Sequence, residues 1–599
     1  MRIACIGTHL TAEFRRMGHE VLDLHPPGGI VDITALLDAR GFAPDLLVQQ
    51  ETLGARVILA GLETLRCRKA YWAIDSHLNM HWHRHYARLF DVLFTPHLSL
   101  FRALPPQWRH PHAVHLAMYG HARPWQPHAG RGHDISLVGV LDKYRPLRGW
   151  LAELLRDRFG VQARQGVPFA EMLHLYGDTR IIPNESIGFE VNFRLTEGAS
   201  CGACVLTPDV GPDQDALFED GHEMVVYTDG LDLLEKLRFL LRKPDVAERI
   251  GRAAWERVQA HHLPGHRAAT VLDAVDRAPG NAATGAAGAE ALWLTLFHRM
   301  RGGALDLPPD AVSTALDTLP ETPANMAARL RAAAEPPKGQ PPLPVRETPA
   351  LAELFDRLLA TGAHADDVDV NVAAAGAALL RGDLKAAKPF WYRLHQARQP
   401  RAPEKPQSVY HACLLWAELL RREDRDAQPG FTYDPERHCP EAAFEMLVLA
   451  QRHNGGDLEW MRGVERLTSR RKALTFYRLG ILARLALEPG APWRTQAEYG
   501  LASLRAYRVE QGLHELAEAG RRATTEGQER AFLRLLDGHG PGGHLRRGLD
   551  MAPATPSAAA PAPSSAAPPG TPQTANPNAE IDLSPNAITA PPADDGHRT

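Results

Sequence analysis

Residues 181–208 read IIPNESIGFEVNFRLTEGASCGACVLTP and place a helical pattern between two short apolar runs. The pattern predicts that a buried strand ends at Asn184, that a loop follows, and that a helix begins near Glu190. The apolar run 203–207 predicts a second strand. A strand, a helix and another strand in this order form the crossover unit of a parallel sheet. This stretch therefore predicts an α/β fold.

The same alternation extends in both directions from this unit. Apolar runs alternate with helical patterns over residues 1–128, and the alternation starts again after the polar connection 128–133. Such alternation favours parallel sheets with helices on both faces. We therefore expect two facing Rossmann-like domains, 1–128 and 129–280. Their ligands should bind in the cleft between them, at the carboxyl ends of the strands.

The second half of the chain is predicted to be helical. Residues 281–346 have helical patterns followed by a Pro-rich linker, and 347–550 show almost no strand pattern. A Gly-Asp turn at 382–383, followed by a small residue and aromatic residues, is typical of a tetratricopeptide-like helix pair. An all-α domain without repeats is the alternative. Residues 551–599 are rich in Ala, Pro, Ser and Thr and are predicted to be disordered.

Composition excludes several classes of function. The formal net charge of −4 argues against nucleic acid as the main partner, because proteins that bind phosphate backbones usually carry a basic excess. No apolar stretch approaches the roughly 18 residues of a transmembrane helix, and the N-terminus predicts a core strand rather than a signal peptide. Six cysteines are too few for a disulfide framework. Reduced thiols fit a cytoplasmic protein.

Three charged residues lie at helical spacing after the strand that ends at Asn184. If the helix begins near Glu190, then Glu190, Arg194 and Glu197 lie on one of its faces. The helix N-terminus offers N–H groups to an anion, and a carboxylate can accept hydrogen bonds from ribose hydroxyls. Together they could bind a nucleoside diphosphate-sugar. A solvated, salt-bridged helix face is the alternative interpretation.

A second cluster follows the first strand of the second predicted domain. Gly139 allows the backbone to approach a ligand closely, and basic residues come just before the next helix. Arginine and lysine can bind a diphosphate, and we favour Arg145 and Arg148 over Lys143. An ordinary basic helix start is the alternative.

A third cluster follows a strand of the first predicted domain. Asp75 lies at the carboxyl end of that strand and should therefore point at the cleft. Asp75 or His77 could take the proton of an acceptor hydroxyl. His77 and His81 stand four residues apart and could bind a metal. Metal binding is the least favoured interpretation, behind catalytic or acceptor-side use and purely structural histidines, so no metal is predicted.

The order of motifs resembles a known family. Asn192-x-Arg194-x-x-Glu197-Gly, the strand 204–207, and the later Gly221-His-Glu223 and Arg249-Ile-Gly stretches are similar to the CgeB-type (spore-maturation-like) glycosyltransferases. These enzymes have the GT-B fold. The resemblance covers residues 134–272 well and 1–128 more weakly.

The resemblance implies transfer of a sugar from a nucleotide-sugar, which is a substrate, without a tightly bound metal or other cofactor. It implies that Glu197 is the ribose-binding carboxylate and that Arg194 is its neighbour. Related retaining enzymes space their two glutamates one residue further apart than Glu190 and Glu197 stand here. Glu185 is an alternative to Glu190, and Ser186 joins the candidate donor-binding residues.

These observations predict a glycosyltransferase whose donor binds the second domain and whose acceptor, a glycan or a protein, binds the first. The helical region would recognise the acceptor or another partner. Two alternatives remain: a nucleotide-sugar epimerase, and a catalytically inactive binding module that works through its helical region. The sugar, the nucleotide and the acceptor are not determined by the sequence.

Overall fold

The computed structural model describes residues 1–551 except for a few internal positions, namely 55, 144, 187, 189, 338, 399–401, 429, 455–456, 470–473 and 541. The tail predicted to be disordered lies outside the described residues from 552 onward. Among the described residues, no helix combines the length and the apolar character that a membrane span requires.

The N-terminal unit is built on a six-stranded parallel sheet. Its strands lie in the order β2-β1-β4-β6-β7-β8, and their bounds are β1 Arg2–Ile6, β2 Glu20–Leu24, β4 Leu46–Gln50, β6 Arg68–Trp72, β7 Val92–Thr95 and β8 Ala113–His115. A small parallel pair, β3 (Gly29–Asp32) with β5 (Val57–Ala60), lies beside it. The strand order reverses between β1 and β4, and this reversal opens a crevice at the carboxyl ends of the strands.

Helices cover both faces of this sheet because its central strands are apolar on both sides; β4 and β7 are buried at every position. The helices of the unit are α1 Thr11–Arg16, α2 Ile33–Asp38, α3 Ser76–Tyr86 and α4 Leu98–Arg102. A later helix, α11 (Pro264–Arg277), returns to this unit, where Val271 and Val275 pack in the same core as Trp72.

The second unit has a four-stranded parallel sheet in the order β12-β11-β10-β9. Its strands are β9 His133–Ile135, β10 Thr179–Pro183, β11 Cys204–Pro208 and β12 Val225–Tyr227. Its helices are α5 Pro146–Phe159, α6 Phe169–Gly177, α7 Phe193–Ser200, α8 Pro212–Asp215, α9 Gly230–Arg242 and α10 Pro244–His261. The two units touch directly where the backbone N–H of Ser99, in α4, donates to the Asp213 carboxylate at 3.2 Å.

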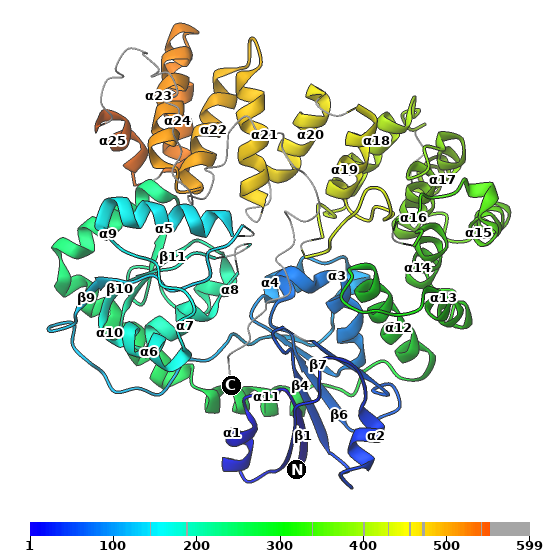
Figure 1. Cartoon of the computed structure of the whole chain (residues 1–599), viewed down its shortest axis with the longest axis horizontal. Coiled ribbons are helices and arrows are strands. Elements are labelled where there is room, and N and C mark those ends of the chain that lie inside the picture. The colour runs from blue at the N-terminus through cyan, green and yellow to red at the C-terminus, as the bar shows by residue number, and fades with distance from the viewer. Residues whose placement is uncertain are drawn as a thin grey trace, which may run out of the picture.

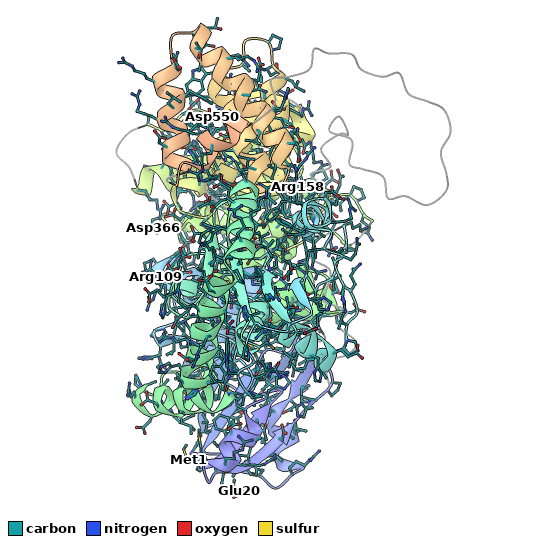
Figure 2. The ribbon with its side chains drawn as sticks, turned by 90° about the vertical axis from the view of Figure 1, so that its left-hand side faces the viewer. Met1, Glu20, Arg109, Arg158, Asp366 and Asp550 are labelled. Carbon is teal, nitrogen blue, oxygen red and sulfur yellow. The ribbon has the colours of Figure 1, made fainter. Side chains whose placement is uncertain are left out.

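The rest of the chain forms an arch of helices that runs from beside the first unit to beside the second (Figure 1). The helices are α12 Gly285–Arg301, α13 Pro309–Thr318, α14 Pro323–Ala334, α15 Pro349–Thr361, α16 Val368–Leu379, α17 Leu384–Arg398, α18 Val409–Arg422, α19 Ala443–Asn454, α20 Leu458–Ser469, α21 Thr475–Leu487, α22 Trp493–Arg505, α23 Val509–Thr525, α24 Glu529–His539 and α25 His544–Met551. Seen from the side, Met1 and Glu20 lie at one end of the molecule and Asp550 at the other (Figure 2).

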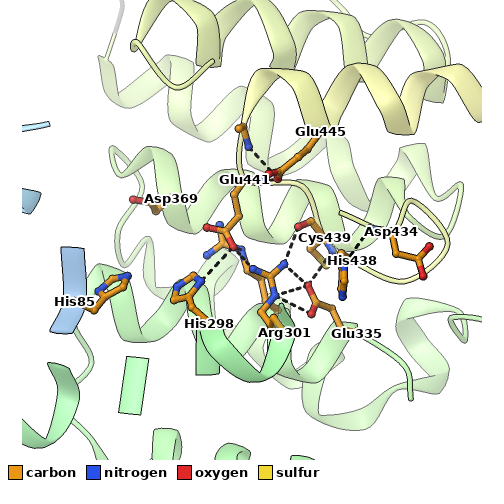
Figure 3. Close-up of polar contacts among 12 residues, drawn as sticks. His85, His298, Arg301, Glu335, Asp369, Asp434, His438, Cys439, Glu441 and Glu445 are labelled. Atoms are coloured by element: carbon orange, nitrogen blue, oxygen red, sulfur yellow. Dashed lines mark hydrogen bonds and ion pairs between the residues drawn. The ribbon is translucent and has the colours of Figure 1, made fainter. Parts of the chain in front are cut away.

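The arch is attached to both α/β units. Near its first helix, α12, the buried Glu441 carboxylate pairs with Arg301 of that helix (Figure 3). The same carboxylate accepts a hydrogen bond from Nη2 of Arg84 in α3 at 3.3 Å. At its end, the hydroxyls of Tyr507 and Tyr227 lie 2.8 Å apart, and Nε2 of His544 lies 2.8 Å from the Asp229 carboxylate. The predicted fold class is confirmed: two parallel α/β units are followed by an all-helical region.

Candidate active site

A cavity of about 1710 Å³ lies between the two α/β units. Its walls include the segments that follow the carboxyl ends of strands in both sheets, as expected for doubly wound folds. Eight of the predicted site residues line it, namely Asp75, His77, Gly139, Arg145, Arg148, Glu190, Arg194 and Glu197. The arch forms a third wall, which the sequence analysis did not include, through Arg299, the segment 302–306, Gly430 and Thr432.

Asp75 lies between β6 and α3, and its side chain faces the cavity. One of its carboxylate oxygens accepts a hydrogen bond from Nη2 of Arg56 at 3.0 Å. Burial raises the pKa of Asp75 to about 6, and the negative charge of Glu51 adds to this effect. A carboxylate with a pKa close to neutrality can accept a proton from a substrate and still be ionised at pH 7.

His77 pairs with a residue of the other unit. Its Nε2 lies 2.9 Å from Oε2 of Glu190. Burial acts to lower the pKa of His77, but the charge of Glu190 outweighs it and the pKa is raised. Ligand atoms of Asp75, His77 and Glu190 all lie within 4.8 Å of one another, close enough to hold one metal ion. The structure thus groups His77 with two carboxylates rather than with His81, the partner considered from its spacing.

Glu190 is not part of the helix that the sequence predicts there. Helix α7 begins at Phe193, and Asn192 before it is extended, with φ −98° and ψ 168°. Nδ2 of Asn192 donates to Oδ1 of Asn184 and to the carbonyl of Glu185, each at 3.0 Å. These bonds hold Asn192 in an extended conformation beside Asn184 and Glu185, so that the helix begins only at Phe193. The prediction that Glu190 shares a helix face with Arg194 and Glu197 is therefore wrong.

Arg194 joins the ends of two strands. Its Nη1 donates to Oδ1 of Asn184 at 2.7 Å, and its Nη2 donates to the carbonyl of Val138 at 2.8 Å. A Cβ atom on Gly139 would lie only 2.9 Å from that Nη2. The absence of a Cβ atom at Gly139 thus leaves room for the Arg194 guanidinium, and Arg194 positions the two strand ends beside the cavity.

Replacing Gly139 with alanine is expected to displace Arg194 and to lower stability by about 1–3 kcal/mol, as overpacking usually does. Gly149 in α5 is the matched control, because an added Cβ there meets no atom within 4 Å. Gly149→Ala should raise stability by about 0.5–1 kcal/mol. Thermal unfolding of both variants checks this pair. Equal melting temperatures for Gly139→Ala and the parent would contradict the assigned role of the glycine.

The remaining basic residues lie at the start of α5. Nε of Arg148 donates to Oε2 of Glu185 at 2.9 Å, and both side chains are buried. Arg145 pairs with Asp142 and also lines the cavity. Glu185 and Ser186 are not among the lining residues: Glu185 holds Arg148, and the Ser186 hydroxyl donates to the backbone of Glu190.

Glu197 lies in α7, is only 3% exposed and lines the cavity. It shares this part of the wall with Tyr176 and Arg194. Burial raises the pKa of Tyr176, and the negative charge of Glu197 adds to the effect. A buried carboxylate at a cavity wall is suited to accept hydrogen bonds from ligand hydroxyls.

Glu51 is a further residue of the site, and it is absent from the candidates that the sequence suggests. Its buried carboxylate accepts hydrogen bonds from the backbone of Ile74 and Asp75 at 2.8 and 2.9 Å, from Nδ2 of Asn79 at 3.1 Å and from Nε of Arg56 at 2.8 Å. Glu51 thereby positions both Asp75 and its partner Arg56. Glu51 directly follows β4, so it lies at the carboxyl end of a strand, which is the position that identified Asp75.

Two Rossmann-like units facing each other across a ligand-sized cavity are the architecture of the GT-B class, as the sequence predicts. Residues 122–273, most of the second unit, match the protein family described as "Glycosyl transferase-like". No curated protein matches the chain.

Solved structures similar to this chain include three from bacteria. They are the sucrose-phosphate synthase from Thermosynechococcus elongatus (12% identity, TM-score 0.35, 46% of this chain and 98% of that chain), a glycosyltransferase from Rickettsia africae ESF-5 (10%, 0.35, 46% and 97%), and Anabaena HepE in complex with UDP-glucose (12%, 0.33, 46% and 99%).

Proposed function

We propose that this protein is a CgeB-type glycosyltransferase with a tetratricopeptide-like helical arch, and that it transfers a sugar from a nucleotide-sugar to an acceptor hydroxyl. The observation that carries the proposal is the cavity shared by both α/β units. Arginines and Glu197 of the second unit lie on one wall, and Asp75 with its raised pKa lies on the other. The six free cysteines support the cytoplasmic location that the sequence predicts.

The donor is proposed to bind the second unit. Glu197 would accept hydrogen bonds from the ribose hydroxyls. Arg145, Arg148 and the N–H groups at the start of α5 would bind the diphosphate, because a helix N-terminus and guanidinium groups both favour an anion. Arg194 would act as a positioning residue, since it already donates to Asn184 and Val138.

The acceptor is proposed to lie against the first unit. Its hydroxyl oxygen would attack the anomeric carbon while Asp75 takes the hydroxyl proton. The bond from that carbon to the diphosphate breaks, and the nucleoside diphosphate leaves with the electron pair, its charge stabilised by the arginines of α5. Because the base and the leaving group lie on opposite walls, this arrangement favours inversion at the anomeric carbon.

Glu197→Gln is expected to weaken binding of a nucleoside diphosphate about tenfold or more, since a charge-assisted hydrogen bond contributes roughly 1.5–3 kcal/mol. Glu190→Gln is the matched control, because Glu190 pairs with His77 across the cavity and should leave nucleotide affinity within about threefold. Calorimetric titration of UDP, GDP, ADP, CDP and dTDP into each protein measures this. The opposite ranking of the two variants would move the ribose contact to Glu190.

The function itself is tested by incubating the full chain with a panel of nucleotide-sugars, with and without candidate acceptors. Release of nucleoside diphosphate that rises with an acceptor supports transfer. Conversion of the donor sugar without release would indicate an epimerase. A chain that binds no nucleotide at all would indicate a binding module that works through its arch.

A further inference from the structure

Arg299 is a charged residue that the arch contributes to the cavity. It lies in α12 and lines the wall next to the first unit. Its side chain is buried, with only 7% of the residue exposed. The guanidinium lies over the ring of Trp82 in α3, 4.8 Å from the ring centroid. The tryptophan therefore fixes the plane of the guanidinium at the cavity wall.

No acceptor within the described part of the chain takes a hydrogen bond from Arg299, and no carboxylate there forms an ion pair with it. Its Nε is buried without a partner. Two residues further along the same helix, Arg301 pairs with both Glu335 and Glu441 (Figure 3). Arg56, which also lines the cavity, is paired with Glu51 and Asp75. Arg299 thus differs from the other buried arginines around it.

Arg299 has no ion-pair partner of its own among the described residues. Burial lowers the pKa of Arg299 to about 10 and the charge of Arg56 lowers it further, while the charge of Glu51, which is already paired with Arg56, opposes this only in part. His81 on the same wall is neutral, because burial and the charges of Arg84 and Arg299 hold its pKa well below 6.5. Buried charges in proteins are normally paired, since an unpaired one costs several kcal/mol. A lone guanidinium that faces a cavity is therefore suited to an anionic ligand.

The position of Arg299 favours the acceptor over the donor as the source of that anion. The arginines proposed to bind the donor diphosphate lie at the start of α5 in the second unit, whereas Arg299 packs on α3 of the first. The cavity of about 1710 Å³ also exceeds the roughly 300–1,000 Å³ of a pocket for one small ligand. It has room for a second ligand beside the donor.

We infer that Arg299 binds a carboxylate or phosphate group of the acceptor, so that the acceptor is an anionic sugar or glycan. This inference rests on the proposed function for its assignment to the acceptor. A guanidinium stacked on an aromatic ring presents its edge N–H groups, which match the two oxygens of a carboxylate or phosphate. The arch would thus select the acceptor by charge, from outside the two α/β units.

The test compares three sugars of different charge: glucose, glucuronate and glucose 6-phosphate. Each is titrated into the full chain with and without a saturating nucleoside diphosphate. We expect the parent to bind at least one anionic sugar about tenfold or more tightly than glucose, and Arg299→Met to lose that preference. The two anionic sugars distinguish a carboxylate site from a phosphate site.

Arg508→Met is the matched control, because Arg508 lies over Trp150, 5.5 Å from the ring centroid, but does not line the cavity. It should keep the preference. Arg299→Met should keep its nucleotide affinity, and its melting temperature should equal or exceed that of the parent, since an unpaired buried charge is removed.

Three results would overturn the inference: a parent without preference for either anionic sugar, an Arg299→Met variant that retains the preference, or a melting temperature lowered by several degrees in that variant. Failure of the proposed function would be distinct. A chain that binds no nucleotide but shows the Arg299-dependent preference would keep the anion site and lose the assignment to a sugar acceptor.

Discussion

Asp75→Asn is expected to lower the rate of sugar transfer, or of donor hydrolysis by water, by roughly 10²–10⁴-fold. The asparagine keeps the size of the side chain and its contact with Arg56, but it cannot take a proton. Nucleoside diphosphate affinity should stay within about threefold of the parent, because Asp75 lies on the wall opposite the proposed donor site. Initial rates and calorimetric titration separate these two effects.

The pH dependence gives a second measurement on the same residue. A base works only when it is deprotonated, and the pKa of Asp75 is about 6. The rate of the parent should therefore rise as the pH increases through about 6, and Asp75→Asn should lose this rise. Asp306→Asn is the matched control, because Asp306 lines the same cavity from the arch and is exposed.

Two results would reassign the cluster. If Asp75→Asn keeps its rate while His77→Gln loses it, then His77 is the base and Glu190 orients it through the 2.9 Å contact. If a chelator abolishes the activity of the parent and added Mn²⁺ or Zn²⁺ restores it, then Asp75, His77 and Glu190 hold a metal ion. We expect activity to survive the chelator, as the family resemblance implies.

Glu441→Ala is expected to lower stability by about 3–5 kcal/mol, the usual cost of removing one partner from a buried ion pair. The Glu441 carboxylate pairs with Arg301 (Figure 3). It also lies 3.3 Å from Nη2 of Arg84 and 3.5 Å from Nε of Arg331. All these side chains are buried. Removing the carboxylate leaves their positive charges without their shared partner.

The loss should affect both the arch and the first α/β unit, because Arg84 belongs to α3 while Glu441 belongs to the arch. Thermal unfolding followed by circular dichroism measures it. Asp356→Asn is the control: Asp356 forms an exposed ion pair with Arg346 at 2.7 Å, and its loss should leave the melting temperature almost unchanged, because water screens exposed pairs. A Glu441→Ala protein as stable as this control would show that the arginines need no shared anion.

The fold class and the approximate places of most strands of the two main sheets could be predicted from the sequence alone, whereas the small pair β3–β5 could not. Alternating apolar runs and helical patterns are local signals, because a side chain's position along a strand or helix decides which face it occupies. The same logic predicted that Asp75 and Gly139 lie where strands reach the cleft, because ligand sites in parallel sheets lie beyond the carboxyl ends of the strands. The structure places both beside the cavity.

Only the tertiary structure decided which side chains meet. Helix α7 starts later than predicted because the side chain of Asn192 donates a hydrogen bond to Asn184, eight residues earlier in the chain. His77 of the first unit contacts Glu190 of the second. Glu441 contacts Arg301 of α12 and Arg84 of α3, and Arg84 is 357 residues away in the chain. Arg299 reaches the cavity only because the arch folds back on the first unit. Such contacts depend on how helices and sheets pack, and no local periodicity of the sequence encodes them. The α/β units therefore follow from the sequence pattern, whereas the pairing of charges in the site follows from tertiary packing.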